Sequence, residues 1–98
     1  MALVPLGAIL KQIIHRTGLE VPVFEAHLAE HWPDVVGQAI AAHTRPGPIQ
    51  HHRLTVYCES SAWLQELTLA KEALLRQVNA VAGSPLVTDL VVKIGRED

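Results

Sequence analysis

Residues 54–59 alternate between apolar and polar side chains, which is the pattern of a half-buried β-strand. Leu54, Val56 and Cys58 form the apolar side, and the residues between them form the polar side. Because alternate side chains of a strand point to the same face, this stretch predicts a strand that packs one face against a core.

A helix start signal follows this strand at once. Ser60 or Ser61 can accept a hydrogen bond from the unpaired backbone amides of a first helical turn. From Trp63 onward, apolar side chains recur every three or four positions, and they predict one helix over residues 61–81. Gly83 and Pro85 then end the helix.

The first half of the chain predicts two helical stretches. Apolar residues at helical spacing predict a short helix over residues 6–15. A second stretch covers residues 23–42 and contains Pro33, which removes a backbone donor and predicts a kink. Gly37 inside this stretch costs up to ~1 kcal/mol relative to alanine. We interpret this glycine as a point where the helix approaches a neighbouring element closely.

Two further strands complete the pattern. Residues 44–48 contain two prolines, which restricts them to an edge strand or an irregular lead-in. His51 and His52 lie where a hairpin turn is expected, and the turn type stays open because no Asn-Gly pair is present. Residues 87–94 predict the last strand. The order of elements predicts an α+β fold in which helices cover one face of a three-stranded sheet.

The composition is that of one folded domain over residues 1–98. Hydrophobic residues make up 49% of the 98 positions and charged residues 18%, which suits a packed core. Cys58 is the one cysteine, so no disulfide can form within the chain. No apolar run reaches the roughly 18 residues of a bilayer span, and residues 1–10 lack the features of a signal peptide. We therefore expect a cytoplasmic protein.

Six histidines raise the question of a metal site. His27 and His31 are spaced i,i+4 on one helix, a geometry that can hold a metal, but the HExxH arrangement is absent. Two solvated histidines are the favoured interpretation, and the pair His51-His52 has the same ambiguity. We expect neither a metal nor another cofactor.

No catalytic arrangement is evident in the sequence. Ser60 and Ser61 fit cap positions and have no Gly-x-Ser-x-Gly motif around them. The carboxylates are dispersed, and the chain contains no glycine-rich phosphate loop. We expect a protein that is not an enzyme.

Charge gives weak support to nucleic-acid binding, because the net charge is −2 and the eight basic residues are scattered along the sequence. Trp32 and Trp63 are expected to anchor the core. Tyr57 should point away from that core, where neighbouring cations could accompany it in base stacking. The candidate nucleic-acid contacts are Arg45, Arg53, Tyr57, Lys71, Arg76 and Lys93.

Two sequence blocks together resemble a known family. Trp32-Pro33, Val36-Gly37 and His43-Thr44 form the first block, and Ser60-Ser-Ala-Trp63 with Gln65-Glu-Leu67 forms the second. Over about residues 6–95 the chain resembles the bacterial DciA family. The residues for which we expect a structural role are Trp32, Pro33, Gly37, Ser60, Ser61, Trp63 and Leu67.

The resemblance implies a KH-like domain that interacts with the replicative DNA helicase DnaB, assists its loading and touches DNA. It implies no enzymatic activity. The chain departs from a true KH domain, because none of its glycines has another glycine three residues away, and the Gly-x-x-Gly loop that clamps nucleic acid is therefore missing. The resemblance also implies that many relatives carry an additional basic tail.

Two hypotheses about function follow. The first is a non-enzymatic adaptor that docks on the replicative helicase; its candidate contacts are His51, His52, Arg53, Gln65, Thr68, Lys71 and Glu72. The second is a stand-alone nucleic-acid-binding module. A scaffold that dimerises with itself is a further alternative, and the sequence leaves the oligomeric state open.

Overall fold

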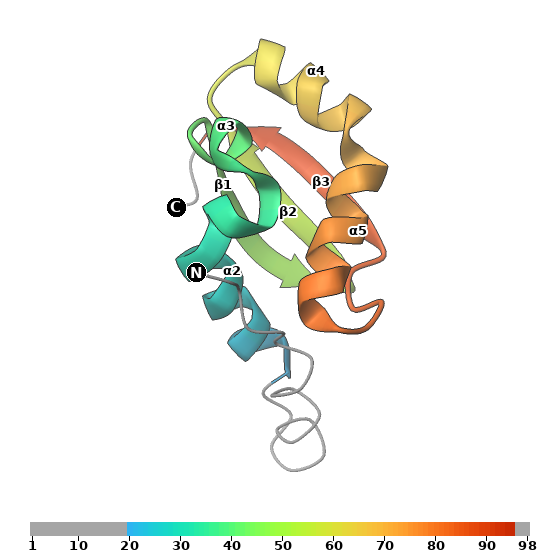
Figure 1. Ribbon diagram of the computed structural model, residues 1–98. Coiled ribbons are helices and arrows are strands. Elements are labelled where there is room, and N and C mark those ends of the chain that lie inside the picture. Colours follow the sequence, from blue (N-terminus) through green and yellow to red (C-terminus); the bar gives the residue numbers. More distant parts are fainter. Residues whose placement is uncertain (1–19, 96–98) are drawn as a thin grey trace.

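A three-stranded mixed sheet with helices packed on it makes up the described part of the chain, residues 20–95 of the computed structural model (Figure 1). The helices are α2 (Glu20–Val36), α3 (Gln38–Ala41), α4 (Ser61–Leu69) and α5 (Lys71–Ala82), and the strands are β1 (Thr44–Gln50), β2 (Arg53–Cys58) and β3 (Asp89–Ile94). This confirms the predicted α+β class. The helix predicted over residues 6–15 lies outside the described residues.

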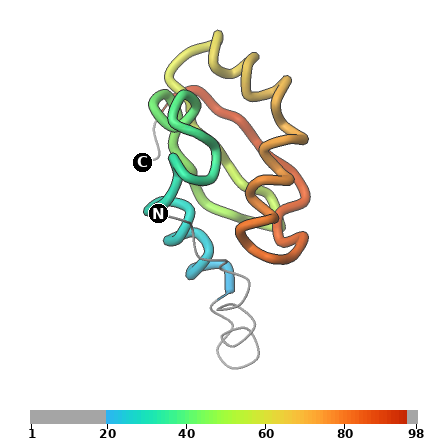
Figure 2. Tube along the Cα trace, in the orientation of Figure 1, coloured from blue at the N-terminus to red at the C-terminus, as the bar shows by residue number. Residues whose placement is uncertain are grey.

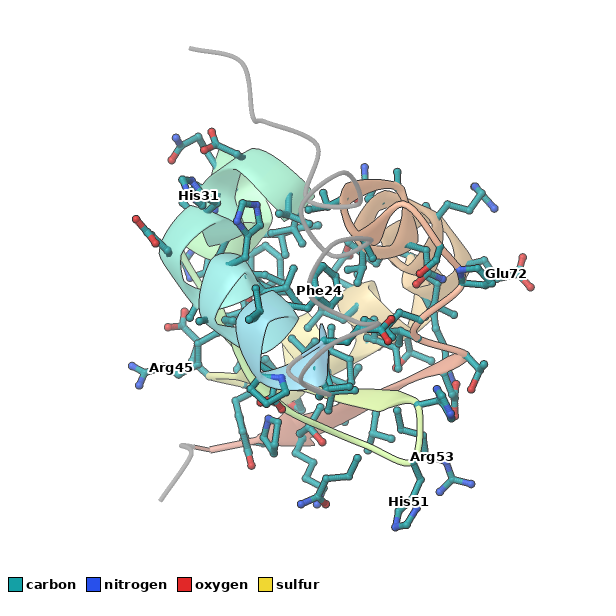
Figure 3. The ribbon with its side chains drawn as sticks, turned by 90° about the horizontal axis from the view of Figure 1, so that it is seen from below. Phe24, His31, Arg45, His51, Arg53 and Glu72 are labelled. Carbon is teal, nitrogen blue, oxygen red and sulfur yellow. The ribbon has the colours of Figure 1, made fainter. Side chains whose placement is uncertain are left out.

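The sheet has the order β1-β2-β3. Strands β1 and β2 are antiparallel, whereas β2 and β3 are parallel. A parallel pair needs a crossover connection, and the chain supplies it by running from β2 through α4 and α5 before it returns as β3 (Figure 2). The helices lie on one side of the sheet, and within the described residues the opposite face carries no helix (Figure 3).

The core lies between the helices and the sheet. Alternation along β2 places Leu54, Val56 and Cys58 in this core, as the sequence pattern predicts. The largest fully buried side chains are those of Phe24, Leu28, Leu54, Val56, Leu67, Val78 and Val87. Trp32 joins them with 5% of its surface exposed, whereas Trp63 is only half-buried and packs against the edge of this core.

The kink in the second helical stretch is present. Pro33 lies inside α2, and His31 has non-helical angles of φ −116° and ψ 24°. The interpretation of Gly37 as a close approach is wrong, because a Cβ atom at this position would have no other atom within 4 Å. Gly37 instead has φ 94° between α2 and α3, a backbone conformation that other residues rarely adopt.

The single helix predicted over residues 61–81 is wrong at Ala70, where φ −91° and ψ 4° separate α4 from α5. Helix α4 contacts β2 and β3, whereas α5 contacts α2 and β3. The two halves therefore pack on different neighbours, and the break lets each reach its own. Ser60 caps α4, because its side chain accepts a hydrogen bond from the Trp63 amide at 3.3 Å.

The hairpin between β1 and β2 closes through a two-residue turn. His51 and His52 have φ of 53° and 64°, the pattern of a type I′ turn built without glycine or asparagine. Thr88 N donates to the His52 carbonyl at 2.7 Å, and His52 Nδ1 hydrogen-bonds the Leu86 carbonyl at 3.1 Å. The segment that leads into β3 thus holds the tip of the hairpin in place.

Candidate functional site

The uncovered face of the sheet is the candidate site. Strand register places Arg45 opposite Tyr57 and Tyr57 opposite Lys93, so that one residue from each strand forms a row across the sheet. Opposite residues share a face, and neighbouring strands lie about 4.8 Å apart. The row therefore sets a tyrosine between two cations.

A second row crosses the other end of the same face. Gln50 is paired with Arg53, and Arg53 with Asp89. Lys71 Nζ lies 2.7 Å from Asp89 Oδ1, and this hydrogen bond is the main reason that the pKa of Asp89 is lowered. Lys71 thereby neutralises the one acidic side chain within the rows, and Arg53 forms no salt bridge with any residue in the range 20–95.

The Tyr57 ring lies against the backbone of β1. A Cβ atom built on Gly47 would lie 2.6 Å from Tyr57 Cε2 and 3.1 Å from the Thr55 carbonyl oxygen. Because glycine has no side chain, Gly47 leaves room for the Tyr57 ring. This contact lies in the irregular part of β1, where the register shifts between Pro46 and Ile49. The ring is half-buried as a result, and its orientation is fixed by packing.

A shallow pocket of about 340 Å³ adjoins the first row at the end of the sheet. It is lined by Ala42, His43, Thr44, Arg45, Tyr57, Cys58, Glu59 and Gly95. His43 Nδ1 lies 2.5 Å from Glu59 Oε1, and the His43 ring stacks on Trp63 with centroids 4.6 Å apart. The lining of this pocket therefore includes the hydrogen-bonded pair of His43 and Glu59 together with the cation of Arg45.

Trp32 supports the same region from the core. Its Nε1 donates to Thr44 Oγ1 at 3.0 Å, and Thr44 Oγ1 donates to the Ile40 carbonyl at 2.7 Å. These bonds tie α2, α3 and the start of β1 together, and so position the strand that carries Arg45. The contact between His43 and Glu59 has no signal in the sequence, because it depends on the hairpin register.

Charge is divided between the two layers of the described chain. The six acidic residues on helices are Glu20, Glu25, Glu30, Asp34, Glu66 and Glu72. The described helices carry only two basic residues, Lys71 and Arg76, whereas strand register places Arg45, Arg53 and Lys93 on the uncovered face of the sheet. The net charge of −2 thus conceals a basic sheet and an acidic helical layer.

The fold brings together four of the six candidate nucleic-acid contacts, namely Arg45, Arg53, Tyr57 and Lys93. Lys71 is engaged by Asp89, and Arg76 is exposed on α5 in the helical layer. The candidate partner contacts fall into two groups. Gln65 and Thr68 are exposed on α4, close to the start of α5, whereas His51, His52 and Arg53 belong to the hairpin tip.

The histidines of α2 lie side by side. The rings of His27 and His31 have centroids 4.6 Å apart, and His31 also lies 3.7 Å from Asp34. Burial, followed by the charge of His31, lowers the pKa of His27. Within residues 20–95, no group of three or more metal-ligating side chains comes together. None of the described helices has the length and apolar character that crossing a bilayer requires.

The family model of DciA, described as Dna[CI] antecedent, matches residues 5–92. The chain belongs to the DciA family. Its similarity to the UPF0232 protein of Mycobacterium tuberculosis is 33% identity over 88 residues, which is 90% of this chain and 47% of the relative. The UPF0232 proteins of Mycolicibacterium smegmatis and Corynebacterium glutamicum are 34% and 29% identical over 89% and 87% of this chain.

This DciA chain spans about half the length of the curated relatives it matches, 45% for M. smegmatis and 48% for C. glutamicum. The matched region includes every residue of the two rows except Lys93, together with all four described helices. The site described above thus lies almost entirely within the part of the chain that is shared with the family.

Proposed function

We propose that this domain is a non-enzymatic adaptor of the replicative DNA helicase, of the DnaB type, and assists its loading in DNA replication. The observation that carries the proposal is the match to the DciA family over residues 5–92, together with the role that membership of this family implies. The acidic helical layer and the uncovered sheet give the domain two chemically different surfaces for binding other molecules.

The adaptor would dock through α4 and the first turn of α5. Leu69 at the end of α4 is 79% exposed, the largest exposed fraction among the large apolar side chains of residues 20–95. Gln65, Thr68 and Glu72 are exposed around it, so an apolar residue lies within a polar rim. Protein interfaces generally have an apolar centre and a polar rim, and Leu69 with its polar neighbours matches this layout.

The test is binding of the full chain to the replicative helicase of the same bacterium, measured by biolayer interferometry in low salt, with helicase unwinding of a forked DNA as the functional readout. Leu69→Glu should weaken binding about tenfold or more, because it places a charge in an apolar contact. Gln77→Glu adds the same charge at an exposed position of α5 and should have no effect. If the wild-type chain does not bind the helicase, the proposed adaptor function is wrong. If both variants bind the helicase equally well, the proposed docking surface on α4 and the first turn of α5 is wrong.

Direct nucleic-acid binding is a second candidate function. The observation that favours it is the charge division, which concentrates Arg45, Arg53 and Lys93 on one face although the chain is acidic overall. Neutralisation of phosphates by clustered cations supplies most of the affinity of such proteins. Fluorescence anisotropy with labelled oligonucleotides in 50 mM salt tests this candidate, and a flat signal with every oligonucleotide would eliminate it.

A further inference from the structure

We propose that the uncovered face of the sheet is a binding site for single-stranded nucleic acid, in which a base stacks on Tyr57 while Arg45, Lys93 and Arg53 contact phosphates. This inference rests on the second candidate function and specifies its ligand and its site.

The geometry of the first row suits a strand laid across the sheet. Tyr57 has a cation on each side, and the spacing of strands places each of them about 5 Å from it at the backbone. Stacking of bases on aromatic rings within a cationic groove is the usual way in which proteins hold single strands. The packing of the ring against Gly47 fixes its orientation before a ligand arrives, which reduces the entropy lost on binding.

The second row extends the site along β2. Arg53 and Tyr57 are separated by four residues of a strand, which is about 13 Å. A ligand must therefore continue beyond one nucleotide to contact both rows. Because Lys71 neutralises Asp89, no uncompensated negative charge within the two rows opposes a phosphate beside Arg53.

A duplex does not fit this face equally well. In a duplex the flat faces of the bases are covered by their neighbours, so none can stack on Tyr57. The major groove admits a helix or a two-stranded ribbon, and a three-stranded sheet is wider than either element. The face consequently favours single strands.

The helical layer offers no comparable site in the described chain. The junction of α4 and α5, Leu69-Ala70-Lys71, contains no glycine that would let a backbone approach closely. Lys71 is paired with Asp89, and six acidic side chains on the helices would repel phosphates. The single-stranded nucleic acid would thus bind the sheet, and the helicase would bind the helical layer on the opposite side of the domain.

The test is anisotropy titration of the full chain with a fluorescein-labelled single-stranded DNA 20-mer, the same sequence as RNA, and the DNA duplex, each in 50 to 200 mM salt. We expect single strands to bind more tightly than the duplex. Tyr57→Phe should bind as the wild type, whereas Tyr57→Leu should lose at least about fivefold, which corresponds to one stacked base. Equal affinity for RNA and DNA indicates contacts to bases and phosphates; a preference for one indicates an added contact to the sugar. Both results are consistent with the site.

The cations are tested one by one with a matched control. Arg45→Gln, Arg53→Gln and Lys93→Gln should each weaken binding and lower the slope of log affinity against log salt by about 0.7 per lost phosphate contact. Arg76→Gln removes the same charge from the exposed side of α5 and should leave both quantities unchanged.

The outcomes separate the site from the function. If the wild type binds none of the oligonucleotides in 50 mM salt, both direct nucleic-acid binding and the proposed site on the sheet are refuted. If the wild type binds but Arg76→Gln weakens binding as much as the sheet variants, the function stands and the site is wrong. Tighter binding of the duplex, or equal binding by Tyr57→Leu and Tyr57→Phe in variants that unfold at the wild-type temperature, also overturns the site.

Discussion

The side chain of Asn79 forms a pair of hydrogen bonds with the backbone of Val87. Nδ2 donates to the Val87 carbonyl at 2.8 Å, and Oδ1 accepts from the Val87 amide at 2.9 Å. Val87 is buried and precedes β3, so these bonds attach the entry of the strand to the last turns of α5.

Replacement of Asn79 by alanine should therefore lower the free energy of unfolding by about 2–3 kcal/mol, because it leaves two backbone groups without partners. Urea unfolding followed by circular dichroism measures the loss. Gln77→Ala changes an exposed residue of the same helix and should stay within about 0.5 kcal/mol of the wild type. Equal effects of the two replacements would show that the Asn79 bonds do not contribute.

Glu25 closes the outer edge of β1. Its Oε2 accepts a hydrogen bond of 2.6 Å from the Ile49 amide, and the two prolines of the strand have no amide hydrogen to offer. Glu25→Ala should lower the free energy of unfolding by about 1–3 kcal/mol and speed hydrogen exchange at the Ile49 amide. Glu25→Gln retains an acceptor and should preserve slow exchange at this amide; fast exchange in both variants would contradict the bond.

The histidine turn stores backbone strain at an exposed position. His51 has φ 53°, and its side chain is exposed. His51→Val should destabilise the domain by about 1–2 kcal/mol, because branched side chains are disfavoured in left-handed backbone. His51→Asn should be neutral or stabilising, since asparagine favours this conformation. Thermal melting measures both, with about 4–8 °C expected per kcal/mol; a valine variant as stable as the asparagine variant would refute the strain.

His27 makes stability depend on pH. Burial and the neighbouring His31 lower its pKa below the ordinary 6.5, and its Nε2 is buried without a hydrogen-bond partner in the described structure. Below pH 6.5 the unfolded chain protonates this histidine more readily than the folded chain does. The free energy of unfolding therefore decreases as the pH is lowered. His27→Leu should thus gain stability relative to the wild type between pH 7 and pH 5 in urea unfolding. Parallel pH profiles of the two proteins would contradict this assignment.

Local chemistry made much of the fold predictable. The alternation at residues 54–58, the cap at Ser60 and the kink near Pro33 each depend on residues close in sequence. The break at Ala70 could not be predicted, because no glycine or proline marks it and it arises from the different neighbours of α4 and α5. Gly37 stands out in the sequence as a glycine within a helical stretch, but its cause is a positive φ that no local pattern predicts.

The candidate site was predictable only in part. Tyr57 could be assigned to the polar side of its strand, but its neighbours Arg45 and Lys93 come from strands whose register the sequence does not reveal. Basic residues that are scattered along the chain consequently gather on one face. The pairing of Lys71 with Asp89, which removes one cation from the candidate set, likewise depends on how α5 lies against β3.

The division of charge between sheet and helices also governs how the molecule approaches another. A positive layer stacked on a negative one amounts to an electric dipole directed across the sheet, and a polyanion exerts a torque on such a dipole. Within the screening length of about 8 Å at physiological salt, this torque turns the β-sheet toward the polyanion and the helical layer away from it. For the nucleic-acid ligand proposed above, encounters that begin in other orientations would thereby be turned toward the sheet before any hydrogen bond forms.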